Sequence, residues 1–114
     1  MVQYSTQLDG VFAALSDPTR RDMIARLSVR PHTVTELAEP HRMSLPAVAK
    51  HIRVLEQAGL LQSVKIGRAR QCRLSPEPLA AAAEWIAHHH EFWEHRLDAL
   101  DQFLARQQEE SRNE

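Results

Sequence analysis

Residues 33–61 constrain the fold of this 114-residue chain most, because they hold two short helix patterns separated by a tight break. Thr33 and Glu36 have the spacing of a capping box, in which each side chain hydrogen-bonds to the backbone of the other residue. Pro40 ends the first pattern, because proline lacks an N–H and restricts the residue before it. Ser44 is placed to cap a second helix. The stretch therefore predicts a helix-turn-helix.

The second helix of this pair has one apolar face and one basic face. Val48, Ile52 and Leu55 recur at helical spacing, so we expect them to be buried, and Gly59 is the expected C-terminal cap. Small and basic residues on the other faces are typical of a helix that enters the major groove of DNA. Any one of them alone could be an ordinary exposed side chain. The residues predicted to contact DNA from this helix are Ser44, Pro46, Ala47, Lys50, His51 and Arg53.

Two stretches of alternating character follow, residues 61–66 and 69–74, with Gly67 and Arg68 between them. This spacing predicts a β-hairpin with glycine in its turn. A basic hairpin after a helix-turn-helix is typical of a wing that follows the sugar-phosphate backbone and minor groove. A plain solvated hairpin is the alternative. The wing residues predicted to contact DNA are Lys65, Arg68 and Arg70.

Charge is distributed unevenly along the chain, although the formal net charge is only −1. Residues 42–73 contain seven basic residues and one acid, a net charge of +6. Residues 74–114 contain nine acids and three arginines, a net charge of −6. Asymmetry of this kind indicates a local anion-binding surface in the middle of the chain.

The segment before the helix-turn-helix predicts two more helices. Residues 1–6 are polar and are expected to fray, and the apolar residues that follow at helical spacing predict a short amphipathic helix. Asp17 and Pro18 form a start signal for the next helix. Arg20 and Arg21 on that helix could contact phosphate or could simply be solvated.

A long helix is predicted for residues 77–107, with an apolar stripe whose spacing alternates between four and three residues. Such a helix is ~45 Å long, and the rest of the chain is too small to cover its apolar face. A second copy of the chain is the expected cover, and packing on the first helix alone is the alternative. Residues 108–114 are expected to form a disordered tail, so the domain is placed at residues 1–107. The predicted dimer-interface residues are Leu8, Phe12, Leu79, Ile86, His90, Trp93, Leu97 and Leu100.

The histidines of this helix raise the question of a metal. Glu84, His88, Glu91 and His95 follow one side of the helix, and their side chains suit zinc or nickel. That line lies about 140° from the apolar stripe, so a solvated row is the simpler interpretation. We therefore expect no metal and no cofactor. His90, in the stripe itself, is expected to be a hydrogen-bonded interface residue, with a ligand or pH-sensing role as the alternative.

Several function classes are disfavoured by the sequence. No apolar run is long enough for a membrane span, and no secretory signal is visible, so we expect a cytoplasmic protein. The single cysteine, Cys72, rules out an internal disulfide and is expected to be a small buried strand residue. An enzyme is not expected, because no phosphate-binding glycine loop and no catalytic carboxylate pair stand out. A protein-interaction module without DNA would leave the basic segment unexplained.

Together these motifs resemble the ArsR/SmtB family of bacterial winged-helix repressors. The resemblance covers residues 8–75 closely and the last helix more loosely, and it rests on residues 14–27, 35–38, 44–60 and 67–68. It implies a mainly α fold with a small β-hairpin wing, and a homodimer formed through the first and last helices. It also implies repression at a double-stranded operator of imperfect dyad symmetry, of its own or a neighbouring operon.

The departures from that family concern its effector. Many members have serine where this chain has Ala49, so one polar contact to DNA is expected to be missing. Residues 33–39 lack the cysteines of the metal-sensing members, and the last helix lacks the Asp-x-His and His-x-x-Glu pattern of others. The chain looks more like the metal-independent branch with a Trp- and Phe-rich last helix. A repressor that responds to metal or a small ligand through the last-helix histidines is the alternative.

Overall fold

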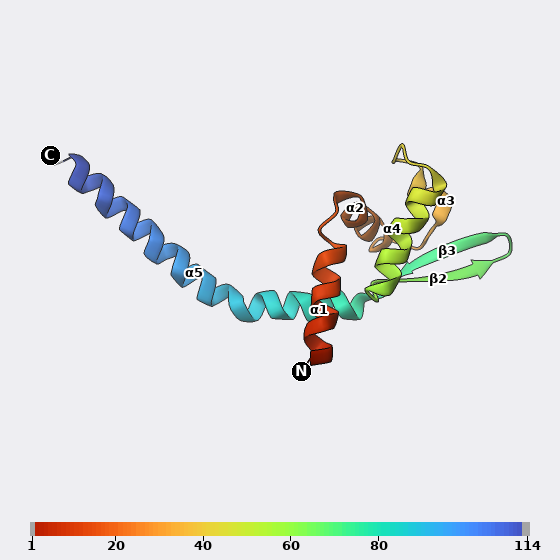
Figure 1. Cartoon of the computed structure of the whole chain (residues 1–114), viewed down its shortest axis with the longest axis horizontal. Coiled ribbons are helices and arrows are strands. Elements are labelled where there is room, and N and C mark those ends of the chain that lie inside the picture. The colour runs from red at the N-terminus through yellow and green to blue at the C-terminus, as the bar shows by residue number, and fades with distance from the viewer. Residues whose placement is uncertain (1, 113–114) are drawn as a thin grey trace. The chain divides into compact units, whose positions relative to one another are not determined.

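The structure, a computed structural model, describes residues 2–112, except for the side chains of residues 2–5 and of Glu91. The helices are α1 (Val2–Ala14), α2 (Pro18–Leu27), α3 (Val34–Ala38), α4 (Leu45–Gln57) and α5 (Pro76–Arg112). The strands are β1 (His32–Thr33), β2 (Leu61–Ile66) and β3 (Ala69–Leu74) (Figure 1). This confirms the predicted fold class, mainly helical with a small antiparallel sheet. The chain divides into two compact units, Met1–Ala82 and Ala83–Glu114.

Local capping sets the helix boundaries of the first unit as predicted. Asp17 accepts hydrogen bonds from two backbone N–H groups at the start of α2, where Pro18 occupies the first helical position. Thr33 and Glu36 form the complete capping box of α3. Ser44 caps α4 through a hydrogen bond from the backbone N–H of Ala47. Each cap satisfies backbone donors that a helix start leaves unpaired.

The carboxyl end of α4 is closed by a Schellman motif centred on Gly59. The N–H of Leu60 donates to the carbonyl of Leu55, and the N–H of Gly59 donates to the carbonyl of Glu56, both at 3.0 Å. Gly59 has a φ of +77°, a backbone conformation that a side chain disfavours. The glycine thus turns the chain from α4 into β2, with Leu60 fully buried behind it.

The sheet has the order β1-β3-β2, and all of its pairings are antiparallel. The β2–β3 hairpin is confirmed in full, with Leu61 opposite Leu74 and a two-residue turn at Gly67 and Arg68. Gly67 has a φ of +61°, as the first turn position of a type II′ hairpin requires. The third strand, β1, was not predicted, because two residues are too few to produce an alternating pattern.

One apolar core holds the first unit together. It takes residues from α1 to α4, from the sheet and from the first turns of α5, and Val48, Ile52 and Leu55 of α4 are buried as predicted. His32 of β1 is the one buried polar residue in the described part of the chain, and its Nδ1 lies 2.9 Å from the carbonyl oxygen of Arg30. The apolar face of α4 is packed in this core, and its opposite face is exposed to solvent.

Both ends of the chain are more helical than expected. The prediction of a frayed N-terminus was wrong from residue 2 onward, since α1 begins at Val2; Met1 lies outside the described residues. Residues 108–114 were expected to form a disordered tail, whereas α5 runs to Arg112; residues 113 and 114 lie outside the described residues. Glutamine, glutamate and arginine are good helix formers, and no glycine or proline interrupts them, so the helix continues. Within residues 2–112 no helix is long and apolar enough to cross a membrane.

Candidate nucleic-acid interface

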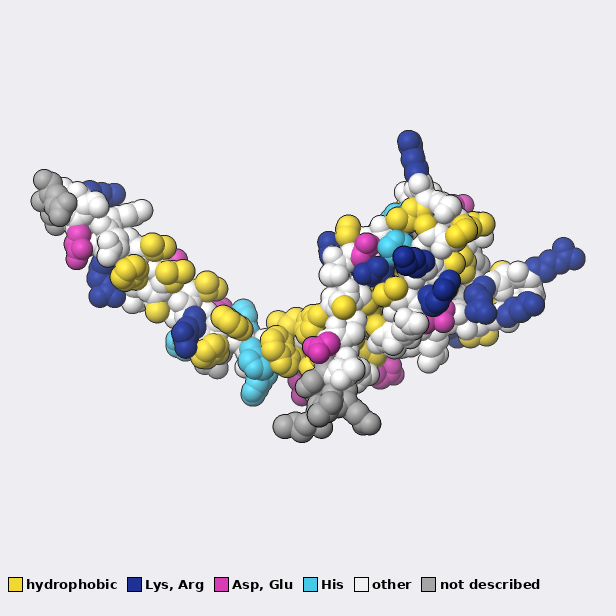
Figure 2. All heavy atoms as spheres, in the orientation of Figure 1, with side chains coloured by type: hydrophobic (Ala, Val, Ile, Leu, Met, Phe, Trp, Pro, Cys, Tyr) yellow, Lys and Arg dark blue, Asp and Glu magenta, His cyan; other side chains and the backbone are white. Residues whose placement is uncertain are grey.

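The polar face of α4 is open to solvent. Ser44, Pro46, Lys50 and Arg53 are exposed, whereas Ala47 and His51 are half-buried. Two residues correspond to about 200° of helix rotation, so Lys50, which lies two residues from both Val48 and Ile52, projects away from the core. Dark-blue Lys and Arg side chains gather over α4 and the β2–β3 hairpin (Figure 2). The arrangement gives one helix a firmly held apolar side and a free basic side.

His51 is held by a contact that sequence reasoning missed. Its Nδ1 lies 3.2 Å from an NH1 nitrogen of Arg20, which is 31 residues earlier in the chain. Arg20 also donates from Nε to the carbonyl of Ala14 at 2.6 Å and from its other terminal nitrogen to the carbonyl of Ala13 at 3.3 Å. Arg20 therefore ties the end of α1 to α4, and no local pattern could have indicated this pairing.

The other arginines of α2 also bind backbone carbonyls. Arg21 donates to the carbonyl of Leu15 at 2.8 Å. Arg26 donates to the carbonyls of Leu37 and Glu36 at 3.1 Å and 2.7 Å. Arg21 stays exposed while it makes this hydrogen bond, and Arg20 is half-buried. Contact of either arginine with phosphate remains a prediction.

The hairpin presents its basic residues close together. Lys65 and Arg70 are directly opposite each other on β2 and β3, and Arg68 is in the turn; all three are exposed. Like charges opposite each other destabilise an isolated hairpin, so this pairing is unfavourable unless an anion lies near it. DNA phosphates would relieve that repulsion.

A short side-chain relay connects the hairpin to the end of α4. Arg70 donates to the hydroxyl of Ser63 at 3.0 Å, and Ser63 donates to a carboxylate oxygen of Glu56 at 2.9 Å. A groove of about 280 Å³ lies beside this relay. It is lined by Val34, Ala49, Ile52, Arg53, Glu56 and Arg70. These hydrogen bonds link the hairpin to α4 and were not visible in the sequence.

The predicted dimer-interface residues fall into two groups. Leu8 is buried and Leu79 is half-buried against the core of its own first unit, so both contribute to folding within one chain. Phe12 is 39% exposed. The other predicted interface residues all lie on α5 and are exposed: Ile86, His90, Trp93, Leu97 and Leu100.

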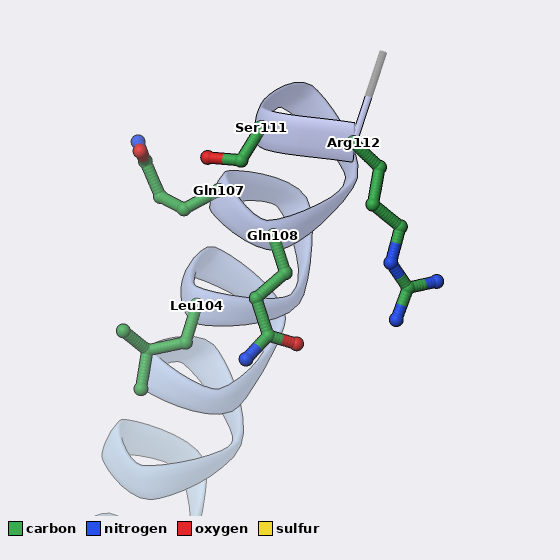
Figure 3. A pocket seen from close by; sticks show the side chains of 5 residues that line it. All are labelled: Leu104, Gln107, Gln108, Ser111 and Arg112. Carbon is green, nitrogen blue, oxygen red and sulfur yellow. The ribbon is translucent and has the colours of Figure 1, made fainter. Parts of the chain in front are cut away.

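The second unit is the remainder of α5, and large apolar side chains run along it (yellow in Figure 2). Phe92, Trp93, Leu97, Phe103 and Leu104 are between 49% and 59% exposed. Near the end of α5 a shallow hollow is lined by Leu104, Gln107, Gln108, Ser111 and Arg112 (Figure 3). Side chains of a single helix cannot enclose a small ligand, so this hollow is not a candidate pocket.

The histidines of α5 make local contacts. His89 stacks on Trp85 with ring centroids 4.3 Å apart, and its Nδ1 lies 2.8 Å from the carbonyl oxygen of Trp85. His90 lies 3.1 Å from a carboxylate oxygen of Glu94, one helical turn along. Within the described residues no group of three His, Cys, Asp or Glu side chains is placed to hold a metal ion. The candidate set Glu84, His88, Glu91 and His95 includes Glu91, whose side chain lies outside the described residues.

Cys72 is fully buried in β3, as expected. Burial raises the pKa of its thiol to about 11, and the negative charge of Glu56 adds to this, whereas Arg70 opposes it. A thiol of this kind is almost entirely protonated near neutral pH and reacts slowly. The geometry gives no support to a redox-sensing cysteine.

The comparison with known proteins agrees with this geometry. A family described as a helix-turn-helix domain matches residues 15–64. The HTH-type transcriptional regulator Rv2034 of Mycobacterium tuberculosis is 35% identical over 96 residues, which span 84% of this chain and 87% of that protein. A crystal structure of the ArsR family transcriptional regulator RHA00566 is 49% identical and superposes with a TM-score of 0.75 over 82% of this chain and 97% of that one. The chain belongs to the ArsR family of helix-turn-helix transcriptional regulators.

Another relative of this ArsR-family chain is the transcriptional repressor SdpR of Bacillus subtilis. It is 29% identical over 79 residues, which span 69% of this chain and 88% of that protein. These relatives regulate transcription and are not enzymes, which confirms that interpretation of the sequence. The family places α3 and α4 as the helix-turn-helix and the β2–β3 hairpin as the wing.

Proposed function

We propose that this ArsR-family protein is a homodimeric, sequence-specific repressor that binds operators of dyad symmetry upstream of its own or a neighbouring operon. The observation that carries the proposal is the face of α4. Its apolar side is fixed in the core, while Lys50 and Arg53 stand exposed on the other side. A rigid helix with free basic side chains and a small first turn suits the major groove.

The wing supports contact with the DNA backbone next to α4. Lys65, Arg68 and Arg70 gather at the hairpin, and the Ser63–Glu56 hydrogen bond ties β2 to the end of α4. In this proposal Lys65 and Arg68 contact phosphates, which adds affinity for any sequence. Ser44, Pro46, Ala47, Lys50, His51 and Arg53 complete the proposed DNA-binding set with Arg70.

Dimerisation is supported by the apolar surface of α5. Exposed tryptophan, phenylalanine and leucine side chains repeat along a helix of 37 residues. Contiguous exposed apolar patches of this kind are rare on soluble monomers and mark interaction sites. The proposed cover for Ile86, His90, Trp93, Leu97 and Leu100 is α5 of a second copy. Phe12 of α1 belongs to the same proposed interface. Leu8 and Leu79 would contribute indirectly, because they pack in the core of their own chain.

Repression independent of metal is the proposed mode of action. The relative SdpR is a transcriptional repressor, and a dimer seated over a promoter excludes polymerase without further chemistry. Cys72 of β3 is buried, and the pKa of its thiol is raised. Metal binding needs the deprotonated thiolate, so this residue is unsuited to it. A repressor that responds to metal or a small ligand through the α5 histidines is the alternative.

Selection of DNA duplexes from a random pool by the full-length protein, followed by footprinting, tests the proposal. Two wings and two α4 helices related by a dyad should protect two half-sites about 10 base pairs, or a multiple of that, apart. An Arg30→Ala and Arg112→Ala double variant is the control. It removes two exposed arginines outside α4 and the wing and should select the same sequence. Protection of one isolated half-site, or no enrichment, would contradict the proposal.

A further inference from the structure

The contact between Arg20 and His51 determines which ring nitrogen of His51 carries a proton. An arginine guanidinium has only N–H donors and no acceptor. Its NH1 nitrogen lies 3.2 Å from Nδ1 of His51, so Nδ1 must be the acceptor. A neutral imidazole that accepts at Nδ1 carries its proton at Nε2. The contact therefore selects one tautomer of His51.

Arg20 is itself held firmly enough to enforce this choice. Its Nε and NH2 nitrogens donate to the carbonyls of Ala14 and Ala13, at 2.6 Å and 3.3 Å. Those carbonyls belong to the last turn of α1, where a cation is favoured. The carbonyl of Ala13 also accepts from the backbone N–H and the hydroxyl of Ser16, at 3.2 Å and 2.6 Å. Two nitrogens of the guanidinium are thus held by α1, and the third, NH1, faces His51 of α4.

The free nitrogen of His51 belongs to the face that the DNA would meet. Among the described residues Nε2 of His51 has no hydrogen-bond partner in the protein, and the side chain is half-buried on the same helix as the exposed Lys50 and Arg53. An Nε2–H group can only donate. Guanine O6 and N7, adenine N7, thymine O4 and phosphate oxygens accept, whereas the amino groups of cytosine and adenine do not.

We propose that Arg20 is a positioning residue that fixes His51 as a hydrogen-bond donor toward an acceptor atom of the bound DNA. This inference rests on the proposed function of α4. In the other tautomer Nε2 would accept, and it would favour the amino groups of cytosine or adenine instead. Arg20 thereby contributes to sequence preference without touching DNA.

The test uses Arg20→Met, which removes the donor, and Arg21→Met as the matched control. Arg21 is the neighbouring arginine, also binds a carbonyl beyond α1, and has no contact with His51. In the wild-type protein and in Arg21→Met, nitrogen-15 NMR should find Nε2 of His51 protonated and Nδ1 bare. In Arg20→Met the two nitrogen shifts should move toward each other as the tautomers mix. A protonated Nδ1 in the wild type, or unchanged shifts in Arg20→Met, would overturn the inference.

The DNA arm uses the duplex that the wild-type protein selects. Arg20→Met should bind it about twofold more weakly per half-site than Arg21→Met does, and so about fourfold as a dimer, because binding must select the donor tautomer from a roughly equal mixture. His51→Gln carries an amide donor near the Nε2 position that needs no help from Arg20. Adding Arg20→Met to His51→Gln should therefore cause no further loss. Equal losses in both backgrounds would mean that Arg20 only supports the fold and would overturn the proposal.

The pattern of the loss identifies the acceptor. A loss confined to one base pair of each half-site assigns the contact to a base edge, and an equal loss on all sequences assigns it to a phosphate oxygen. Failure of the wild-type protein to select any sequence would instead contradict the proposed function. The NMR arm would still decide whether Arg20 sets the tautomer of His51, because it needs no DNA.

Discussion

Asp17 illustrates how a single side chain starts a helix in this protein. Its Oδ1 accepts from the backbone nitrogens of Thr19 and Arg20 at 2.8 Å and 3.1 Å. Burial by itself would raise the pKa of the carboxyl, but these hydrogen bonds outweigh it and the pKa is lowered. A carboxyl whose folded pKa lies below its unfolded value near 3.9 stabilises the fold above that value. The contribution is lost as the pH falls through the folded pKa.

We therefore predict that Asp17→Ala lowers the free energy of unfolding by about 1 kcal/mol at pH 7, the usual cost of losing an N-cap. The difference from the wild type should shrink at pH 3, where the wild-type carboxyl is becoming protonated. Urea unfolding followed by circular dichroism at both pH values measures this. Asp17→Asn, which keeps a capping oxygen but no charge, should fall between Asp17→Ala and the wild type at pH 7. A constant difference between Asp17→Ala and the wild type at both values would exclude a role for the charge.

At the scale of elements, replacing Gly10 within α1 or Gly59 just after α4 by alanine should change the stability of the fold in opposite directions. Gly59 has a φ of +77°, and a Cβ there would meet Pro78 at an ordinary 3.5 Å, so backbone strain dominates the cost. Gly59→Ala should destabilise the fold by about 1–2 kcal/mol. Gly10 lies within α1, and a Cβ added there would meet nothing within 4 Å, so Gly10→Ala should stabilise by about 0.5–1 kcal/mol. Thermal unfolding measures both, and a stabilised Gly59→Ala would refute the Schellman interpretation.

The wing is a second element with a separable role. Each lost phosphate contact reduces the slope of log affinity against log salt by about 0.9. Lys65→Ala with Arg68→Ala should therefore weaken binding to all sequences and flatten the slope by up to about 2 units per protomer. Fluorescence anisotropy between low and moderate salt measures this. The Arg30→Ala and Arg112→Ala double variant should keep the wild-type slope, and an unchanged slope in the wing variant would place the hairpin away from the phosphates.

At the scale of the whole molecule, the proposed dimer depends on the long helix α5. A helix of 37 residues is about 55 Å long, and its apolar side chains beyond residue 83 are about half exposed in the single chain. Trp93 is 55% exposed, and a tryptophan at the centre of an interface contributes about 2 kcal/mol or more to association. Trp93→Glu should therefore weaken the dimer by more than about 30-fold and abolish operator binding.

Sedimentation velocity in the micromolar range measures the dissociation that Trp93→Glu should cause. His88→Glu is the matched control, because it introduces the same charge on the same helix, five residues and about 140° away from Trp93. It should leave the dimer intact. A stable Trp93→Glu dimer would place the interface on another surface.

Much of the first unit could be predicted from the sequence, since capping boxes, glycine caps and hairpin turns act within a few residues. Asp17, Thr33, Ser44, Gly59 and Gly67 each mark a boundary that the structure confirms. The ends of the chain were predicted less well. Polar composition indicated disorder there, but helix propensity without a glycine or proline extends α1 and α5.

The sequence alone determined the elements, their order and the basic and apolar faces of α4, because periodicity and capping are local properties of the chain. Only the tertiary structure decided which basic side chains hydrogen-bond within the protein and which are exposed to solvent. It placed Arg20 against His51, connected Arg70 through Ser63 to Glu56, and added β1 beside β3. Arg20 and His51 are 31 residues apart, Glu56, Ser63 and Arg70 follow one another at seven-residue steps that match no helix or strand pattern, and β1 has only two residues. Packing of the core brings them within hydrogen-bond distance, and no local rule specifies that distance.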